Sequence, residues 1–121
     1  MGKARDVIER YYEAFDRKDP AWKELVAPDV RFEGPLQSAY GSAEFQEITE
    51  TFLRFHKGTR VLARFEQGGD VCSILEFDLM TPAGLPMTCA VSELATIADG
   101  KLSKVRVIYD PREFAAAFGL S

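Results

Sequence analysis

The first half of the chain places apolar residues three and four positions apart, which is the spacing of an α-helix. Residues 4–17 have this pattern, with Tyr11 in the apolar stripe and Tyr12 at its edge. Asp19 and the proline after it are typical of a helix start, so a short second helix is expected there. Residues 42–56 predict a third helix with an aromatic-rich inner face.

The second half alternates apolar and polar residues with the period of a strand. A short strand is expected at residues 30–33, a hairpin at residues 60–80 and two long strands at residues 86–109. A short C-terminal helix follows, with Asp110 as its N-cap. This order predicts a single α+β domain over residues 1–121, with the N-terminal helices on one face of a curved antiparallel sheet.

The direction of Glu93 depends on the turn between the two long strands. If Gly100 forms a bulge after a type I turn, Glu93 lies among apolar residues on one face of the sheet. If the loop contains only Asp99 and Gly100, Glu93 lies opposite Arg106 as an ordinary ion pair on the other face. The sequence leaves both alternatives open.

Two further acids belong to the strand at residues 71–80. Glu76 and Asp78 alternate with apolar residues at positions 75, 77 and 79, and the apolar set is expected to face the helices. The two acids would then point outward. A shift of the strand by one residue would instead bring them beside Glu93, and the clustered charges would raise the pKa of at least one carboxyl.

His56 and the two cysteines are also candidates for chemistry. His56 is expected to be a partly exposed residue near the end of the third helix, with a catalytic base as the alternative. Cys72 and Cys89 are expected to be small buried residues, too far apart in the predicted strands for a disulfide. Because the sequence has no cluster of Cys and His, neither a metal site nor a cofactor is expected.

Charge and composition narrow the range of partners. The net charge is −4 and no basic stripe occurs, so nucleic acid is not expected to bind. No apolar run approaches the roughly 20 residues that span a bilayer, so no membrane partner is expected either. Residues 1–10 carry both signs of charge, unlike a signal peptide, and this predicts a cytoplasmic location.

Four phrases of the sequence together resemble a known superfamily. They are VIERYYEAFDRKD, LVAPDVRFEGPL, YGSAEF and SELATIADGKLSKVRVIYDPREF. In this order they are similar to the nuclear transport factor 2-like superfamily and, within it, to the SnoaL-like polyketide cyclases and ketosteroid isomerase-like proteins. The resemblance implies a cone-shaped fold with a deep apolar pocket, and in many cases a homodimer formed through the outer sheet face. Here Ala90, Leu102 and Ile108 are the apolar residues expected on that face.

The resemblance also implies roles for single residues. The helix tyrosine that donates a hydrogen bond in ketosteroid isomerases corresponds to Tyr11, and the pocket aromatic at the end of their last strand corresponds to Tyr109. Their strand acid falls near Glu93 if the turn here is one residue shorter, and on Ser92 if it is not.

The general base of those isomerases falls on Gly34, which has no carboxylate. Proton transfer between two carbons in the isomerase manner therefore lacks its base, unless Glu33, Glu76 or Asp78 takes that role. Steroid isomerisation is not predicted for this chain.

The sequence thus predicts a small-molecule-binding SnoaL-like protein and favours an isomerase, cyclase or dehydratase that needs no cofactor and acts on an apolar, carbonyl-bearing substrate. Glu93 would be the acid/base group, and Tyr11 would donate a hydrogen bond to a developing enolate oxygen. The pocket walls are expected to include Phe15, Trp22, Phe32, Phe52, Phe55, Val91, Val107 and Tyr109.

Two other functions stay open. One is a non-catalytic ligand-binding or assembly domain that uses the same pocket or the outer sheet face. The other is a hydrolase or dehydratase that uses Glu76 or Asp78 with Arg106, and it requires the shifted strand.

Overall fold

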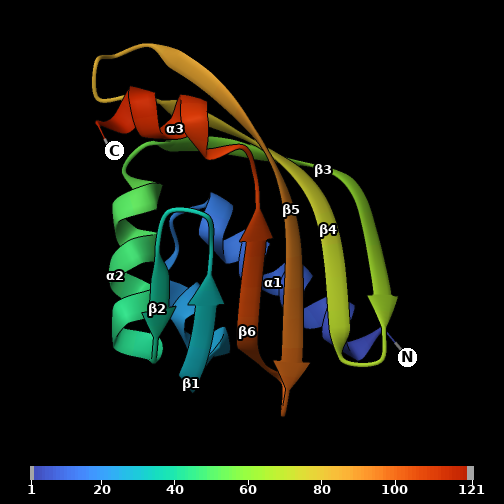
Figure 1. The fold of residues 1–121 in the computed structure, drawn as a ribbon. Coiled ribbons are helices and arrows are strands. Elements are labelled where there is room, and N and C mark those ends of the chain that lie inside the picture. Colours follow the sequence, from blue (N-terminus) through green and yellow to red (C-terminus); the bar gives the residue numbers. More distant parts are fainter. Residues whose placement is uncertain (1, 120–121) are drawn as a thin grey trace.

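Six strands form one curved sheet, and the helices pack on its concave side and at its ends (Figure 1). The structure is a computed structural model that describes residues 2–119. The strand order is β2-β1-β6-β5-β4-β3, and neighbouring strands are antiparallel except β1 and β6. The predicted α+β class with a curved sheet is confirmed. The elements are α1 (Lys3–Asp16), the 3-10 helix η1 (Pro20–Leu25), β1 (Val26–Glu33), β2 (Ser38–Tyr40), α2 (Ser42–Leu53), β3 (His56–Gln67), β4 (Asp70–Met80), β5 (Pro86–Ala98), β6 (Lys101–Ile108) and α3 (Pro111–Phe118).

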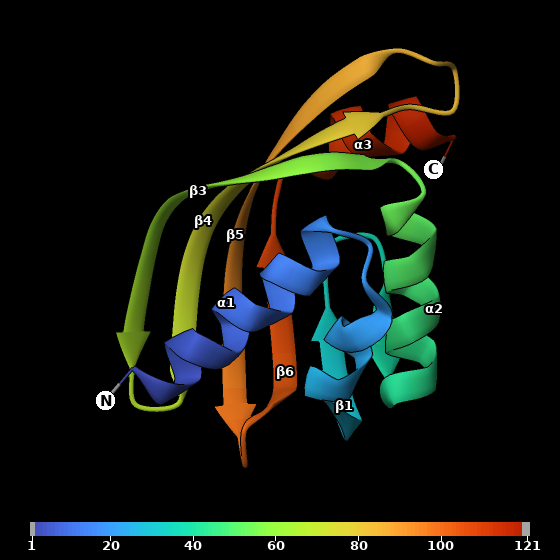
Figure 2. The ribbon, with the colours of Figure 1, turned by 180° about the vertical axis from the view of Figure 1, so that it is seen from behind.

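Helix α1 crosses the concave face of the sheet, as Figure 2 shows from behind. Its apolar stripe is wider than the sequence predicts, because α1 contacts four strands, β3 to β6. Tyr12, expected at the edge of the stripe, is only 6% exposed. The buried residues of the helix are Ala4, Val7, Ile8, Tyr11, Tyr12, Ala14 and Phe15.

The hairpin between β5 and β6 combines parts of both predicted turns. Its loop contains only Asp99 and Gly100, both with positive φ, and Ala98 pairs with Lys101. The predicted type I turn with a bulge at Gly100 is therefore wrong. A bulge occurs instead at Ser103, which the pairing register skips.

The Ser103 bulge decides which residues of β6 lie on the same face as Glu93. Beyond it Glu93 pairs with Val107 rather than with Arg106, which pairs with Leu94. Directly opposite residues lie on the same face of a sheet, so Glu93 faces the helices together with Val107. The predicted ion pair between Glu93 and Arg106 is wrong. Glu93 lies among apolar residues as the other alternative predicts, but without the bulge at Gly100 that this alternative requires.

Strand β4 has the register that its apolar residues predict. The side chains at positions 71, 73, 75, 77 and 79 are buried beneath the helices. Glu76 and Asp78 lie on the outer face, where Arg60 of β3 forms ion pairs with both. The shifted strand is therefore wrong, and the hydrolase or dehydratase that depends on it is excluded.

The chain leaves helix α2 earlier than predicted. The helix ends at Leu53, and His56 begins strand β3 and pairs with Leu79. The backbone carbonyl of Phe55 accepts a hydrogen bond from Met80, so residues after the helix join the sheet. His56 is 2% exposed, and the expected partly exposed position is wrong.

Helix α3 lies over the end of the sheet where β6 stops (Figures 1 and 2). Asp110 accepts a hydrogen bond from the backbone nitrogen of Arg112, as the predicted N-cap requires. The helix is held by aromatic contacts, since Phe118 lies edge-on to Phe55 and stacks on Phe114. Within residues 2–119 no helix is both long and apolar enough to cross a membrane.

Candidate functional site

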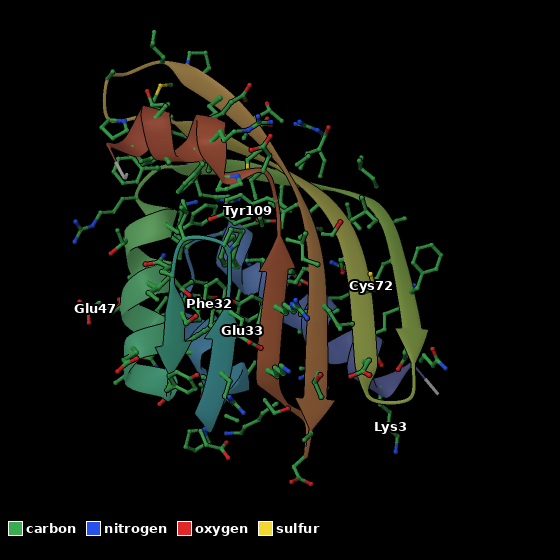
Figure 3. The ribbon with its side chains drawn as sticks, in the orientation of Figure 1. Lys3, Phe32, Glu33, Glu47, Cys72 and Tyr109 are labelled. Atoms are coloured by element: carbon green, nitrogen blue, oxygen red, sulfur yellow. The ribbon has the colours of Figure 1, made fainter. Side chains whose placement is uncertain are left out.

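A cavity of about 130 Å³ lies between helices α1 and α2 and the concave face of the sheet. Phe32 and Tyr109, labelled in Figure 3, both line this cavity, whereas Glu47 of α2 points away from the molecule. The polar side chains of the lining are those of Gln37, Thr49, Cys89 and Glu93, besides three tyrosine hydroxyls. The aromatic residues of the lining are Tyr11, Tyr12, Phe15, Phe32, Phe45, Phe52, Phe77, Tyr109 and Phe114.

Most residues expected in the pocket walls do line this cavity, but two do not. Trp22 is buried behind the wall, with its ring edge-on to those of Tyr11 and Phe45. Phe55 lies outside it, against Phe118. The expected residues that line it are Phe15, Phe32, Phe52, Val91, Val107 and Tyr109.

Sequence reasoning missed several lining residues. Phe45 and Phe77 lie on the predicted inward faces of α2 and β4 but were not among the expected pocket walls. The apolar patterns of these two elements therefore contained the signal for them. Gln37 lies in the irregular segment between β1 and β2, where no periodicity indicates direction. Phe114 reaches the cavity only because α3 folds back over the sheet, which the local pattern does not indicate.

Among the described residues that line the cavity, Glu93 is the only acidic one. It is 4% exposed, and its Oε2 accepts a hydrogen bond from the Tyr12 hydroxyl. Its Oε1 is buried and has no hydrogen-bond partner among the described residues. A buried polar atom without a partner is costly, so Oε1 is the atom best placed to bind a polar group in the cavity.

Burial raises the pKa of Glu93 from its usual 4.5 to about 7. The Tyr12 hydrogen bond and the positive charge of Arg64 both act in the opposite direction and favour the carboxylate. A carboxyl with a pKa near 7 exchanges its proton readily at neutral pH, which is the requirement for a general acid or base.

The two tyrosines of α1 have different partners. Tyr12, and not Tyr11, binds Glu93. Tyr11 lies edge-on to Tyr12 with 5.2 Å between the ring centroids, and its hydroxyl interacts with Thr49 of α2. Burial raises the pKa of both hydroxyls, so both are neutral hydrogen-bond donors.

The position of the isomerase base is tightly packed, so a side chain there would require its neighbours to move. A Cβ atom on Gly34 would lie 3.1 Å from Val107 and 3.5 Å from Phe32. Glu33 is no substitute, because it forms an ion pair with Lys104 at 3.4 Å, and both side chains are nearly half exposed. Glu93 is therefore the carboxyl on which proton transfer in this cavity can depend.

His56 lies outside the cavity and belongs to a buried polar network. Lys18 Nζ donates to its Nδ1 at 2.8 Å, and its Nε2 lies 2.8 Å from the Thr59 hydroxyl, which donates to Asp16. Burial and the charge of Lys18 lower the pKa of His56 to about 4. His56 is thus neutral with both ring nitrogens occupied, which does not suit a base acting on a ligand.

The cysteines do not form a metal site or a disulfide. Both are free and partly exposed, so the expected full burial is wrong. Cys89 lines the cavity and Cys72 belongs to the outer face, because it alternates with buried residues of β4. Among residues 2–119 no group of three or more His, Cys, Asp or Glu side chains could hold a metal ion.

The comparisons with known proteins agree with this geometry. A nuclear transport factor 2-like protein of unknown function from Cytophaga hutchinsonii is 28% identical, with 92% of this chain and 93% of that one covered and a TM-score of 0.80. A proposed SnoaL-like polyketide cyclase from Jannaschia is 15% identical, with 98% and 93% covered and a TM-score of 0.82. A proposed ketosteroid isomerase from Kribbella flavida is 16% identical, with 91% and 79% covered and a TM-score of 0.78.

The latter two structures show the likeness of fold alone. No curated protein matches the chain. The sequence model of the SnoaL-like domain matches residues 8–105, from the first helix to the middle of β6. That range includes Tyr11, Tyr12 and Glu93. The chain therefore belongs to the SnoaL-like domain family.

Proposed function

We propose that this protein binds a neutral, carbonyl-bearing small molecule in its cavity and transfers a proton to and from a carbon atom of that molecule. The observation that carries this proposal is the position of Glu93, which lines an aromatic cavity and has one buried carboxyl oxygen, Oε1, without a partner among the described residues while Tyr12 holds Oε2. The reaction class is an isomerisation, cyclisation or elimination that needs no cofactor.

The proposed chemistry uses one carboxyl as both base and acid. Ionised Glu93 removes a proton from the carbon next to the carbonyl, and the bonding electrons move to the carbonyl oxygen as an enolate. The Tyr11 hydroxyl donates a hydrogen bond to that oxygen. Glu93 then returns the proton to the same or a conjugated carbon in an isomerisation, to the alkoxide formed by carbon–carbon bond closure in a cyclisation, or to a hydroxyl that leaves as water in an elimination, so no other reactant is consumed.

The lining supports a neutral ligand. Among the described residues no Lys, Arg or His lines the cavity, so an anionic ligand would meet the Glu93 carboxylate without a compensating cation. Nine aromatic residues provide flat apolar walls.

The size of the cavity supports a ligand with a single ring. Its volume of about 130 Å³ is close to that of an engineered protein cavity of roughly 150 Å³ that binds benzene. A polycyclic skeleton needs several times this space. Among apolar, carbonyl-bearing substrates, the volume thus favours a monocyclic compound.

The proposal is tested by deuterium exchange into 2-cyclohexen-1-one, a neutral single-ring ketone, followed by NMR in D₂O. Catalytic amounts of the protein are expected to accelerate exchange next to the carbonyl. The rate should rise as the pH passes through about 7, because the ionised form of Glu93 is the base. Exchange at the uncatalysed rate throughout pH 5–9 would contradict proton transfer by this protein.

A second candidate is a binding domain without catalysis. It is favoured by Gly34, since the chain lacks the carboxylate that the resemblance to ketosteroid isomerases implies there and packs Val107 closely against that position. Binding of the same ketone, seen by calorimetry, without any exchange would support this alternative.

We also propose a homodimer through the outer sheet face. Phe65, Leu94 and Ile108 expose 64%, 43% and 59% of their surface there, and Phe65 and Leu94 both pair with Cys72 of β4. Leu102, expected on this face, is fully buried, so that part of the expectation is wrong. A contiguous exposed apolar patch is typical of an interface. A cytoplasmic location stays a prediction.

The Leu94→Glu variant is expected to be monomeric where the unmodified chain is dimeric, because a charged carboxylate would be buried in the apolar interface. Light scattering at micromolar concentration measures this. Leu85→Glu is the control, since Leu85 is 63% exposed but lies in the loop between β4 and β5. A monomeric unmodified chain would contradict the proposed dimer.

A further inference from the structure

Arg64 is a buried cation on the inner face of the sheet, close to the site but outside the cavity lining. Its side chain is only 6% exposed. The residue faces inward because of a bulge at Leu62. Val61 pairs with Leu75, but Ala63 pairs with Ile74, so the register skips Leu62 and the side chains after it change face.

The bulge aligns three polar residues across three strands. Arg64 of β3 pairs with Ser73 of β4, and Ser73 pairs with Glu93 of β5. Directly opposite residues share a face, so all three point toward helix α1. Ser73 is fully buried. A buried row of this kind in an apolar core is costly unless its members act on one another.

The contacts of Arg64 place its guanidinium next to Tyr12, which in turn binds Glu93. Its Nε donates to the Ser73 hydroxyl at 2.8 Å, and its guanidinium carbon lies 5.8 Å from the centre of the Tyr12 ring. Glu9, nearly half exposed, is 3.9 Å from Nη1 and partly balances the charge. Nη2 is buried without a hydrogen-bond partner among the described residues.

We propose that Arg64 is a positioning residue that holds Tyr12 against Glu93 and sets the proton affinity of the Glu93 carboxyl from beneath the tyrosine ring. The inference rests on the proposed function only in that both concern the same carboxyl. Arg64 touches neither the ligand nor the reacting atoms, yet its charge shifts Glu93 toward the ionised form before the ligand arrives.

The surroundings of Glu93 leave Arg64 as the source of this effect. Helix α1 presents the neutral hydroxyls of Tyr11 and Tyr12, and α2 presents Thr49. Strands β4 and β6 present the uncharged residues Ser73 and Val107. Burial acts whether or not Arg64 is present. The Tyr12 hydrogen bond favours the ionised carboxyl first, and the positive charge of Arg64, which also lies against the Tyr12 ring, adds to it.

The experiment is a ¹³C NMR titration of the Glu93 carboxyl in selectively labelled protein, without ligand. In Arg64→Met the pKa of Glu93 is expected to rise by about one unit or more, the usual effect of removing a neighbouring cation. Arg64→Lys keeps the charge and is expected to stay nearer the unmodified chain. Arg64→Gln replaces Arg64→Met if the latter does not fold.

Arg60→Met is the matched control, because Arg60 lies on the same strand but pairs with Glu76 and Asp78 on the outer face. It is expected to leave the titration of Glu93 unchanged. An unchanged titration in folded Arg64→Met, or an equal shift in Arg60→Met, would overturn the inference. Since the titration involves no substrate, failure of the exchange assay would not affect this result.

Discussion

Replacing Glu93 by glutamine is expected to slow deuterium exchange into 2-cyclohexen-1-one by roughly 10²- to 10⁴-fold, the usual contribution of a general acid or base. Glutamine has nearly the same shape and can still accept the hydrogen bond from Tyr12, so the cavity and its walls should be retained. The amide cannot take up a proton from carbon. Binding of the ketone, measured by calorimetry, should therefore change far less than the rate.

Glu76→Gln is the matched control for this experiment. Glu76 lies on the neighbouring strand β4, but its side chain is on the outer face and pairs with Arg60. The exchange rate of this variant should equal that of the unmodified chain. Full exchange activity in Glu93→Gln would remove Glu93 from the mechanism, and equal losses in both variants would point to a general effect on folding.

The same Glu93→Gln substitution is expected to change how stability depends on pH. In the folded chain the pKa of Glu93 is raised from 4.5 to about 7, so between these values the folded state holds a proton that the unfolded state releases. Raising the pH therefore destabilises the unmodified chain through this group, by about 3 kcal/mol in total. Glu93→Gln has no carboxyl at this position and is not destabilised in this way. Its free energy of unfolding minus that of the unmodified chain should therefore increase by that amount from pH 4.5 to pH 8.

The titration of His56 makes stability depend on pH in the opposite direction. Its pKa falls from 6.5 to about 4 on folding, so the unfolded state holds the extra proton and raising the pH stabilises the fold. Across roughly pH 4.5 to 6.5 the two effects nearly cancel in the unmodified chain. Urea unfolding at several pH values should thus show rising stability with pH for Glu93→Gln and falling stability for His56→Gln. Parallel curves for all three proteins would contradict both assignments.

The elements of this fold are well determined by local sequence. The apolar stripe of α1, the N-cap at Asp110 and the alternation in β4 each follow from short-range rules, and the structure has all three. The inward direction of Phe77 also followed from alternation. These features need only the neighbours along the chain, which the sequence displays directly.

The site depends on features that no local pattern contains. The residue types at Ser103 and Leu62 do not mark these positions as bulges. Yet the bulge at Ser103 directs side chains of β6 inward, and the bulge at Leu62 does the same for Arg64. Tyr12 is buried because the sheet curves around α1, which is a property of the tertiary structure. For the same reason the sequence indicates Tyr11 and Tyr12 as neighbours on a helix but does not show which of them reaches Glu93.

The cavity also has a consequence for the stability of the fold as a whole. The cavity is partly open to solvent, and its volume of about 130 Å³ therefore forgoes at most roughly 3 kcal/mol of packing, at about 24 cal/mol per Å³. This is a large share of the 5–15 kcal/mol that typically separates folded from unfolded protein. A ligand at a free concentration of about 100 times its Kd would increase the free energy of unfolding by roughly 2.7 kcal/mol. Larger side chains in the walls would restore a similar amount permanently, so in this protein improved packing and ligand binding compete for the same volume.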